Sequence, residues 1–371
     1  YVSALQEGHN TGNDKTPNVS GSLNFSDVSG VDETWRSFAY YANADYNYKY
    51  KYFVQGGLSM ETSSRFGRDV EAGLKLAGVH WGLFPSIQTA WLLSSEDFFN
   101  REALGINSLK LSAGYDVSGN DDVAITASRT SLSATRFMNG SVGLVLNNIG
   151  NTGIQWETTH RLRVGLDLTE YNNILAFSLN FFKSYTNNLL TLKSLPEITG
   201  EGYYWSNDGS LENIGLDFGV RFKLLNRKNW KWELGANATA YKNKITALPD
   251  GDYTTTIYGA NVLTSVGRAA GVFYGYETDG VYATQQEAEE AGLTLVSTTG
   301  EVTPFAAGDM KFVDHVQDGI INEKDMVVIG NPNPDVYGNL YSNLSYKRLS
   351  LNMNFNYSFG NDIYNYQRSQ L

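Results

Sequence analysis

The segment from Leu349 to Phe359 alternates strictly between apolar and polar side chains. In a β-strand, side chains point alternately to the two faces, so one face here carries only large apolar groups and the other only Asn and Ser. A soluble sandwich usually mixes charged residues into its outer face. A strand with a fully apolar face and an uncharged polar face is typical of a barrel wall between lipid and a wet lumen.

The same alternation recurs along the chain and predicts about ten strands that are each long enough to cross a bilayer. Charged residues such as Arg163, Asp167, Asp217, Arg221 and Lys223 fall on the polar faces, where a watery lumen would solvate them. We therefore expect an all-β fold, an antiparallel transmembrane β-barrel segment. Its strands are expected at about 37–62, 81–116, 154–186, 213–242 and 335–359.

The connections alternate between short turns and long loops, as in outer-membrane barrels, which have short periplasmic turns and long extracellular loops. The longest extracellular loop is expected at 243–334, with a helix from Thr284 to Leu293 that Thr284 caps. Residues 92–107 are the exception, a long connection on the short-turn side. Residues 1–35 are expected to be loop, and Pro85 suggests either a bulge in its strand or a barrel rim.

Composition narrows the class of protein. The chain has no Cys, a net charge of −11, and a mean hydropathy of −0.32. The acidic balance argues against a nucleic-acid partner, which requires a basic surface. No apolar run reaches the roughly 18 residues of a membrane-spanning helix, and a membrane barrel needs none because only every second strand residue must be apolar.

Several sequence blocks, in their order and spacing, carry a resemblance to one family. The chain resembles the SusC/RagA-like TonB-dependent transporters of the Bacteroidetes outer membrane. The blocks are Y-N-Y-K-Y-K-Y at 46–52, S-S-R-F-G at 63–67, W-G-L-F-P-S at 81–86, S-E-D-F-F at 95–99, L-K-L-S-A-G-Y-D-V-S-G-N at 109–120, W-E-T-T at 156–159, V-G-L-D-L at 164–168, L-E-N-I-G-L-D-F at 211–218, F-Y-G-Y-E-T-D-G-V-Y at 273–282, G-D-M-K-F-V-D at 308–314, I-G-N-P-N-P-D at 329–335 and F-G-N-D-I-Y-N-Y at 359–366.

The resemblance implies a plugged barrel of about 22 strands, of which residues 1–371 would form about half as a single partial domain. It also implies import of oligosaccharides or oligopeptides across the Gram-negative outer membrane, with a SusD-like lid lipoprotein and energy from TonB. The sequence begins at Tyr1 and shows no plug and no TonB box, so we expect a fragment or a processed chain. An adhesin or structural outer-membrane protein, and a soluble carbohydrate-active enzyme, remain the alternatives.

The segment from Asp314 to Asp325 approaches a calcium-loop pattern. Asp314, Asp318, Asn322 and Asp325 would supply side-chain oxygens and Ile320 a carbonyl, which suggests Ca²⁺ or Mg²⁺. Val316 stands where the pattern expects an oxygen ligand, and many members of the family carry D-x-N-G-D-G here. A tight Asp-Gly turn held by side-chain hydrogen bonds is the alternative explanation of the same residues.

Catalytic chemistry finds little support in the sequence. The four His residues show no zinc-binding spacing, and no G-x-S-x-G is present, so we expect no enzyme. Tyr203, Tyr204 and Trp205 are candidate substrate contacts, because aromatic faces in an extracellular loop can stack on sugar rings. They can equally pack the loop against its neighbours.

Overall fold

The computed structural model describes residues 2–11, 22–32, 34–136, 142–170, 172–195, 198, 203–249, 251–296 and 300–369. Its main feature is one long sheet in which every neighbouring pair is antiparallel. In spatial order its strands are β26 (Leu349–Phe359), β25 (Val336–Tyr346), β15 (Trp230–Ala247), β14 (Ser210–Asn226), β11 (Leu175–Asn187), β10 (Glu157–Glu170), β7 (Ile106–Asn120), β6 (Val79–Leu92), β4 (Tyr52–Ser63) and β3 (Ser37–Tyr48), with β5 (Leu74–Leu76) paired to β6.

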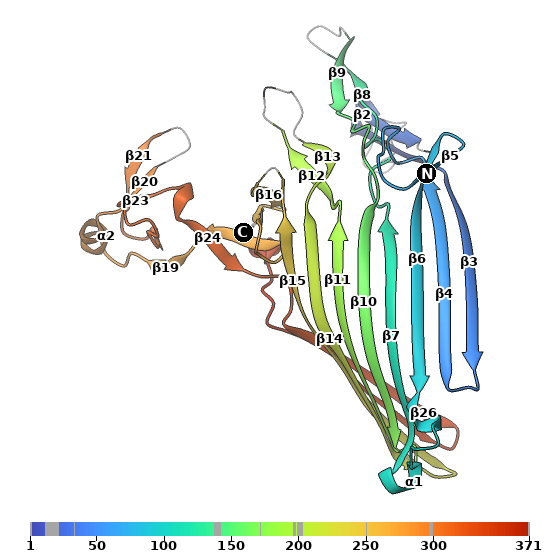
Figure 1. The fold of residues 1–371 in the computed structure, drawn as a ribbon. Helices are drawn as coiled ribbons and strands as arrows, with labels where there is room; N and C mark the ends of the chain where they lie inside the picture. Colours follow the sequence, from blue (N-terminus) through green and yellow to red (C-terminus); the bar gives the residue numbers. More distant parts are fainter. Residues whose placement is uncertain are drawn as a thin grey trace.

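The sheet is curved, so that β25 and β26 lie behind the strands at its other end (Figure 1). Within the described residues, β3 and β26 each pair with a single neighbour and form its two edges. None of the helices in this part of the chain has the length and apolar character needed to cross a membrane. The expected set of long antiparallel strands is therefore confirmed, as an open curved wall.

Short turns gather at one end of the sheet and long loops at the other (Figure 1). The turn between β25 and β26 needs only Lys347 and Arg348, and Lys347 adopts a positive φ of 53°. The turn between β3 and β4 likewise has positive φ at Lys49 and Tyr50. Two successive residues of this kind form the tight turn that matches the twist of paired strands.

The long-loop end carries several small hairpins. Two of them are β8 (Ser131–Arg136) with β9 (Val142–Asn148), and β12 (Leu190–Ser194) with β13 (Tyr203–Asn207). A third, β1 (Val2–Thr11) with β2 (Ser22–Asp32), shows that the expectation of loop throughout residues 1–35 was wrong. The alternation in these strands is weak and the pair contains a register shift at Gly8, which explains why the sequence did not reveal it.

Of the two alternatives for Pro85, the bulge was wrong. Pairing between β4 and β6 runs without a register shift through Leu58 and Pro85. The pairing of β6 with β7 instead begins at Ser86, so Pro85 lies just beyond the end of that ladder. A proline has no N–H to donate, and this place at the end of one ladder accommodates it without an extra residue.

Residues 248–334 form an excursion between β15 and β25, which extends from β16 beside β15 to α2 at the far left of Figure 1. Its core contains Tyr282, Ala288, Phe305 and Ile321, with Phe312 packed against it. The elements are β16 (Tyr253–Ile257), β17 (Ala260–Thr264), β18 (Val272–Tyr276), β19 (Thr278–Val281), α2 (Gln285–Ala291), β20 (Thr294–Val296), β21 (Val302–Pro304), β22 (Met310–Phe312), β23 (Ile320–Ile321), η5 (Glu323–Asp325) and β24 (Met326–Gly330).

The predicted helix of the excursion is confirmed as α2. The hydroxyl oxygen of Thr284 accepts the N–H of Glu287 at 3.2 Å, and Oε2 of Glu287 accepts the N–H of Ala283 at 2.9 Å. These two bonds satisfy N–H groups that a helix start leaves without partners. The remaining helical pieces of the chain are η2 (Leu93–Ser95), α1 (Arg101–Leu104) and α3 (Tyr366–Ser369).

Candidate functional site

The polar side chains of neighbouring strands lie in continuous rows across the inner face of the sheet. Backbone pairing sets Asp45 opposite Gln55, Gln55 opposite Gln88, Gln88 opposite Gly114, and Gly114 opposite Arg163. Because each strand alternates with period two, every second residue of these strands joins the same face. The inner face is therefore a wall of amides, hydroxyls and charges, and the outer face holds the apolar residues.

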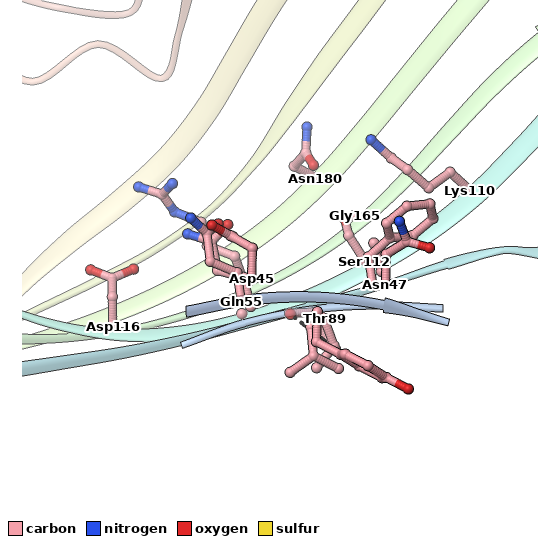
Figure 2. A pocket seen from close by; sticks show the side chains of 17 residues that line it. Asp45, Asn47, Gln55, Thr89, Lys110, Ser112, Asp116, Gly165 and Asn180 are labelled. Atoms are coloured by element: carbon pink, nitrogen blue, oxygen red, sulfur yellow. Dashed lines mark hydrogen bonds between the residues drawn. The ribbon is translucent and has the colours of Figure 1, made fainter. Parts of the chain in front are cut away.

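Part of this wall borders a hollow of about 600 Å³ that spans β3, β4, β6, β7, β10 and β11. In Figure 2 the side chains of Asp45, Gln55 and Asn180 stand on one side of the strands, while Thr89 points to the other. We name this hollow the lumen basin. Its polar lining comprises Asp45, Asn47, Gln55, Gln88, Lys110, Ser112, Asp116, Arg163 and Asn180.

Opposite charges compensate one another across β7 and β10. Nζ of Lys110 lies 2.8 Å from a carboxylate oxygen of Asp167, and a guanidinium nitrogen of Arg161 lies 3.5 Å from Asp116. These side chains are partly exposed, so each pair contributes little to stability and mainly fixes where the charges stand. The basin thus presents both positively and negatively charged side chains, and it does not select strongly for an anion or a cation.

Glycines on the same face make room for bulky neighbours. A Cβ on Gly235 would lie 2.2 Å from ring atoms of Tyr341, and one on Gly165 would lie 2.4 Å from Oδ1 of Asn180. Tyr341 and Asn180 therefore lie over the backbone of the next strand. This arrangement keeps the wall shallow and leaves the lumen open.

The sequence placed Arg163 and Asp167 correctly on the polar face, but it did not reveal the lumen basin. Asp45, Gln55 and Gln88 belong to three strands, and only the strand register brings them together. The short turn between β3 and β4 could have aligned Asp45 with Gln55, because a short turn fixes the pairing of the strands it joins. The connections from β4 to β6 and from β6 to β7 are long, so no turn fixes the register that brings Gln88 beside Gln55.

The three predicted loop aromatics lie on β13, where alternation separates neighbouring side chains. Trp205 packs against a buried cluster formed by Val123, Ala127 and Ile154. Tyr204 instead borders a separate hollow of about 280 Å³ beside Pro249. Tyr203 lies in the described backbone of β13. A role of these residues in substrate binding stays a prediction, and Trp205 also has a clear packing role.

The Asp314–Asp325 loop is held by hydrogen bonds to its own backbone. Oδ1 and Oδ2 of Asp314 accept the N–H groups of Gln317 and Gly319 at 2.6 and 2.8 Å. Oδ1 of Asp318 accepts the N–H of Ile320 at 3.0 Å. Such bonds are typical of the tight turn considered above.

Asp325, the last residue of the loop, is fully buried. Its carboxylate accepts N–H groups from His315 and Val316 at 3.1 and 3.2 Å and from Asn322 at 2.9 Å. Burial acts to raise the pKa of Asp325, but these hydrogen bonds and a contact with Asp314 outweigh it and lower the pKa.

The carboxylate oxygens that would bind Ca²⁺ or Mg²⁺ already accept these backbone N–H groups. No group of three or more His, Cys, Asp or Glu side chains that could hold a metal occurs in the part of the chain that the structure describes. These residues therefore do not fit the predicted cation well, and its binding stays a prediction.

A charged cluster at the short-turn end was not anticipated. The carboxylate of Glu96 accepts the hydroxyl of Tyr52 at 2.7 Å, the indole N–H of Trp91 at 3.0 Å and Nζ of Lys51 at 3.0 Å. Hydrogen bonds from Tyr52, Trp91 and Lys51 lower the pKa of Glu96 to about 2. The S-E-D-F-F block contains this residue, but Lys51 and Tyr52 lie more than forty residues earlier, so the sequence alone does not show the cluster.

Known outer-membrane receptors are similar to most of this chain. No protein-family model matches the chain. A TonB-dependent receptor of Formosa agariphila, P26, is 32% identical over 351 residues, which cover 92% of this chain and 33% of the receptor. The receptor SusC of Bacteroides thetaiotaomicron is 25% identical and matches 88% of this chain. Over most of its length the chain is similar to the SusC/RagA-like TonB-dependent receptors.

The solved structures agree on the fold. The RagAB peptide importer in its closed-closed state superposes with a TM-score of 0.72 and covers 94% of this chain at 19% identity. This SusC/RagA-like chain spans about a third of the length of these relatives, 33% of P26 and 31% of SusC. Its curved sheet is accordingly a transmembrane barrel wall of the outer membrane, with the apolar face toward lipid and the polar face toward the lumen.

Proposed function

We propose that the lumen wall of this chain lines the passage of a TonB-dependent importer for oligosaccharides or oligopeptides. The observation that carries the proposal is the polar, charge-balanced inner face of a sheet whose outer face is apolar. Such a wall offers many weak hydrogen bonds to a polar, uncharged or mixed-charge molecule and no single strong site that would retain it. The mechanism is gated passage with energy supplied through TonB, without covalent chemistry.

The relatives support this proposal through their names. They are receptors and importers, and one of them is called a peptide importer. An adhesin or structural protein of the outer membrane is the second candidate, because exposed hairpins at the long-loop end could bind other surfaces. The two candidates differ in one respect, since only an importer needs TonB.

Uptake by living cells tests the proposal. A strain that lacks the full-length receptor should lose growth on particular members of a panel of glycans and peptides, and the intact gene should restore it. Removal of TonB should abolish the same growth. A deletion strain that grows normally on every glycan and peptide but no longer adheres to surfaces would favour the adhesin.

We further propose that the excursion of residues 248–334 contacts a SusD-like lid lipoprotein. Val281 of β19 and Met310 of β22 are paired across the two strands and are both exposed, with 57% and 49% of their surface accessible. Neighbouring exposed apolar residues on a surface loop are typical of a protein contact. A helix and a core that are independent of the sheet give this patch a fixed shape.

Co-purification tests this contact. The double change Val281→Asp and Met310→Asp should reduce the lid lipoprotein recovered with the full-length receptor at least several-fold, because interface residues of this kind often dominate binding. Leu144→Asp on β9 is the matched control, since Leu144 is as exposed. Deleting residues 271–304 would be less informative because it removes Tyr282 and Ala288 from the core. Unchanged recovery with the double variant would argue against this contact.

A further inference from the structure

The connection between β6 and β7 is the exception among the short turns, and it is folded into a fixed shelf. The N–H of Leu92 donates to the carbonyl of Lys51 at 2.7 Å, which ties the start of the connection to the β3–β4 turn. Nε of Arg101 donates to the carbonyl of Ser94 at 2.5 Å, and Asn100 caps α1 by accepting the N–H of Ala103. We name residues 93–105 the rim shelf.

The rim shelf lies against the outward, lipid-facing side of the sheet. Tyr52 and Trp91, which hold Glu96 of the shelf, are paired residues on the apolar face, and their rings stack with centroids 6.2 Å apart. The ring of Tyr48 continues this row at 6.4 Å from Tyr52. Outer-membrane barrels place such aromatic belts at the membrane–water interface. Glu96 binds the polar edges of these rings, so the shelf meets the belt from the water side.

The rim shelf exposes large apolar side chains at this level. Phe98, two residues after Glu96, has 72% of its surface accessible, and Leu104 has 58%. Tyr50 in the adjacent turn is also exposed, at 76%. A folded surface in water gains nothing from presenting Phe and Leu in this way, whereas the interface of a bilayer accepts amphipathic side chains.

We propose that the rim shelf rests in the lipid headgroup layer of the leaflet at the short-turn end, with Phe98 inserted toward the acyl chains. Glu96 joins the shelf to the outward aromatic belt, Phe98 and Leu104 of the same shelf are exposed, and hydrogen bonds hold the connection in place. The expected partner is the phospholipid surface, with Lys49 placed in the adjoining turn to meet phosphate groups. The inference goes beyond import and does not depend on it.

Site-directed spin labelling tests the inference. The probe is a nitroxide on Phe98→Cys in the full-length receptor, free of other cysteines and embedded in phospholipid nanodiscs. Oxygen dissolves in lipid and a nickel chelate stays in water, so the two reagents report the depth of the label. We expect the label at residue 98 to be relaxed several-fold more by oxygen than by the chelate.

Asp97→Cys is the matched control, because Asp97 is the neighbouring residue and is fully exposed. Its label should be relaxed more by the chelate. A label at residue 98 that is as accessible to the chelate as the label at residue 97 would overturn the inference. So would a label shielded from both reagents, which would indicate a protein contact. If Phe98→Cys does not fold, Leu104→Cys gives the same reading, with the same outcomes for and against.

Discussion

The sheet and the excursion of residues 248–334 are stabilised in different ways. The excursion buries Tyr282, Phe305 and Ile321 in a compact core, as a water-soluble domain does. The sheet presents its large apolar side chains outward, and Leu349, Phe355 and Phe359 are 61–73% accessible. In the membrane, lipid covers that outward face. Apolar burial in water therefore stabilises the excursion, while strand pairing and lipid contact stabilise the sheet.

This difference predicts which substitutions destabilise each of the two regions. In the excursion, the size of a buried side chain decides stability, because a cavity is left when atoms are removed. In the sheet, the effect of a substitution on stability depends on the face where the residue lies, because a charge is tolerated in the lumen and is costly in lipid. The same charged substitution should therefore destabilise the barrel at one residue of a strand and be tolerated at the next.

The largest effect is expected from Ile321→Ala in the excursion. Ile321 is fully buried, and this truncation should cost about 2–5 kcal/mol of local stability. Hydrogen exchange on the full-length receptor should show faster exchange throughout the excursion and unchanged protection in β10 and β11. Val302→Ala is the control, because Val302 is 60% exposed and its truncation should change stability by at most about 0.5 kcal/mol. Equal loss of protection in the sheet would show that the two regions are not independent.

The second-largest effect on stability is expected from a charge placed on the lipid-facing side of the sheet. Leu179 pairs with Leu166 and Phe218 on the outward side, near the middle of the apolar band. Leu179→Lys should destabilise the barrel by about 2–4 kcal/mol, measured by urea unfolding of the full-length receptor in vesicles. Ser178→Lys is the control, because Ser178 faces the lumen beside Asp167 and opposite Gly219. If Leu179→Lys and Ser178→Lys lower the free energy of unfolding equally, the assignment of the lipid and lumen faces is wrong.

Most of the sheet could be predicted from sequence, because alternation and turn length act locally. The ends of its strands could not. β14 begins at Ser210 and β15 ends at Ala247, both outside the predicted range of 213–242. Backbone pairing between the two strands continues where the alternation of apolar and polar residues stops. Lys183 and Glu212 form an ion pair of 2.9 Å in this upper part, where charged side chains replace the apolar pattern.

The candidate site was harder to predict because it depends on register and on distant partners. Polar faces were readable for Arg163 and Asp167, but the ion pair of Lys110 with Asp167 requires the alignment of β7 with β10. Asp325 illustrates the same limit. The sequence pattern suggested a metal ligand, whereas the carboxylate accepts the N–H groups of His315 and Val316 about ten residues away.

A smaller effect is expected from Asp325→Asn. The amide keeps the shape of the carboxylate, but one of its two oxygens becomes a donor and can no longer accept a backbone N–H. Leaving a buried N–H without a partner costs about 1–3 kcal/mol, so the amides of His315, Val316 and Asn322 should exchange faster. Asp318→Asn is the control, because Asp318 is exposed and one acceptor oxygen is sufficient there. Equal protection in both variants would argue against the buried carboxylate as the centre of this loop.

The smallest effect concerns the rim shelf and depends on pH. The pKa of Glu96 is lowered from 4.5 to about 2, so its contribution to stability is fully present above pH 4.5 and is lost as the pH falls toward 2. A nitroxide on Asp97→Cys in the full-length receptor should become more mobile over that window. Glu96→Gln should remove this pH dependence and give intermediate mobility throughout, because the amide still accepts the hydroxyl of Tyr52 but carries no charge for Lys51. A pH profile that is unchanged in Glu96→Gln would mean that another group fixes the shelf to the aromatic belt.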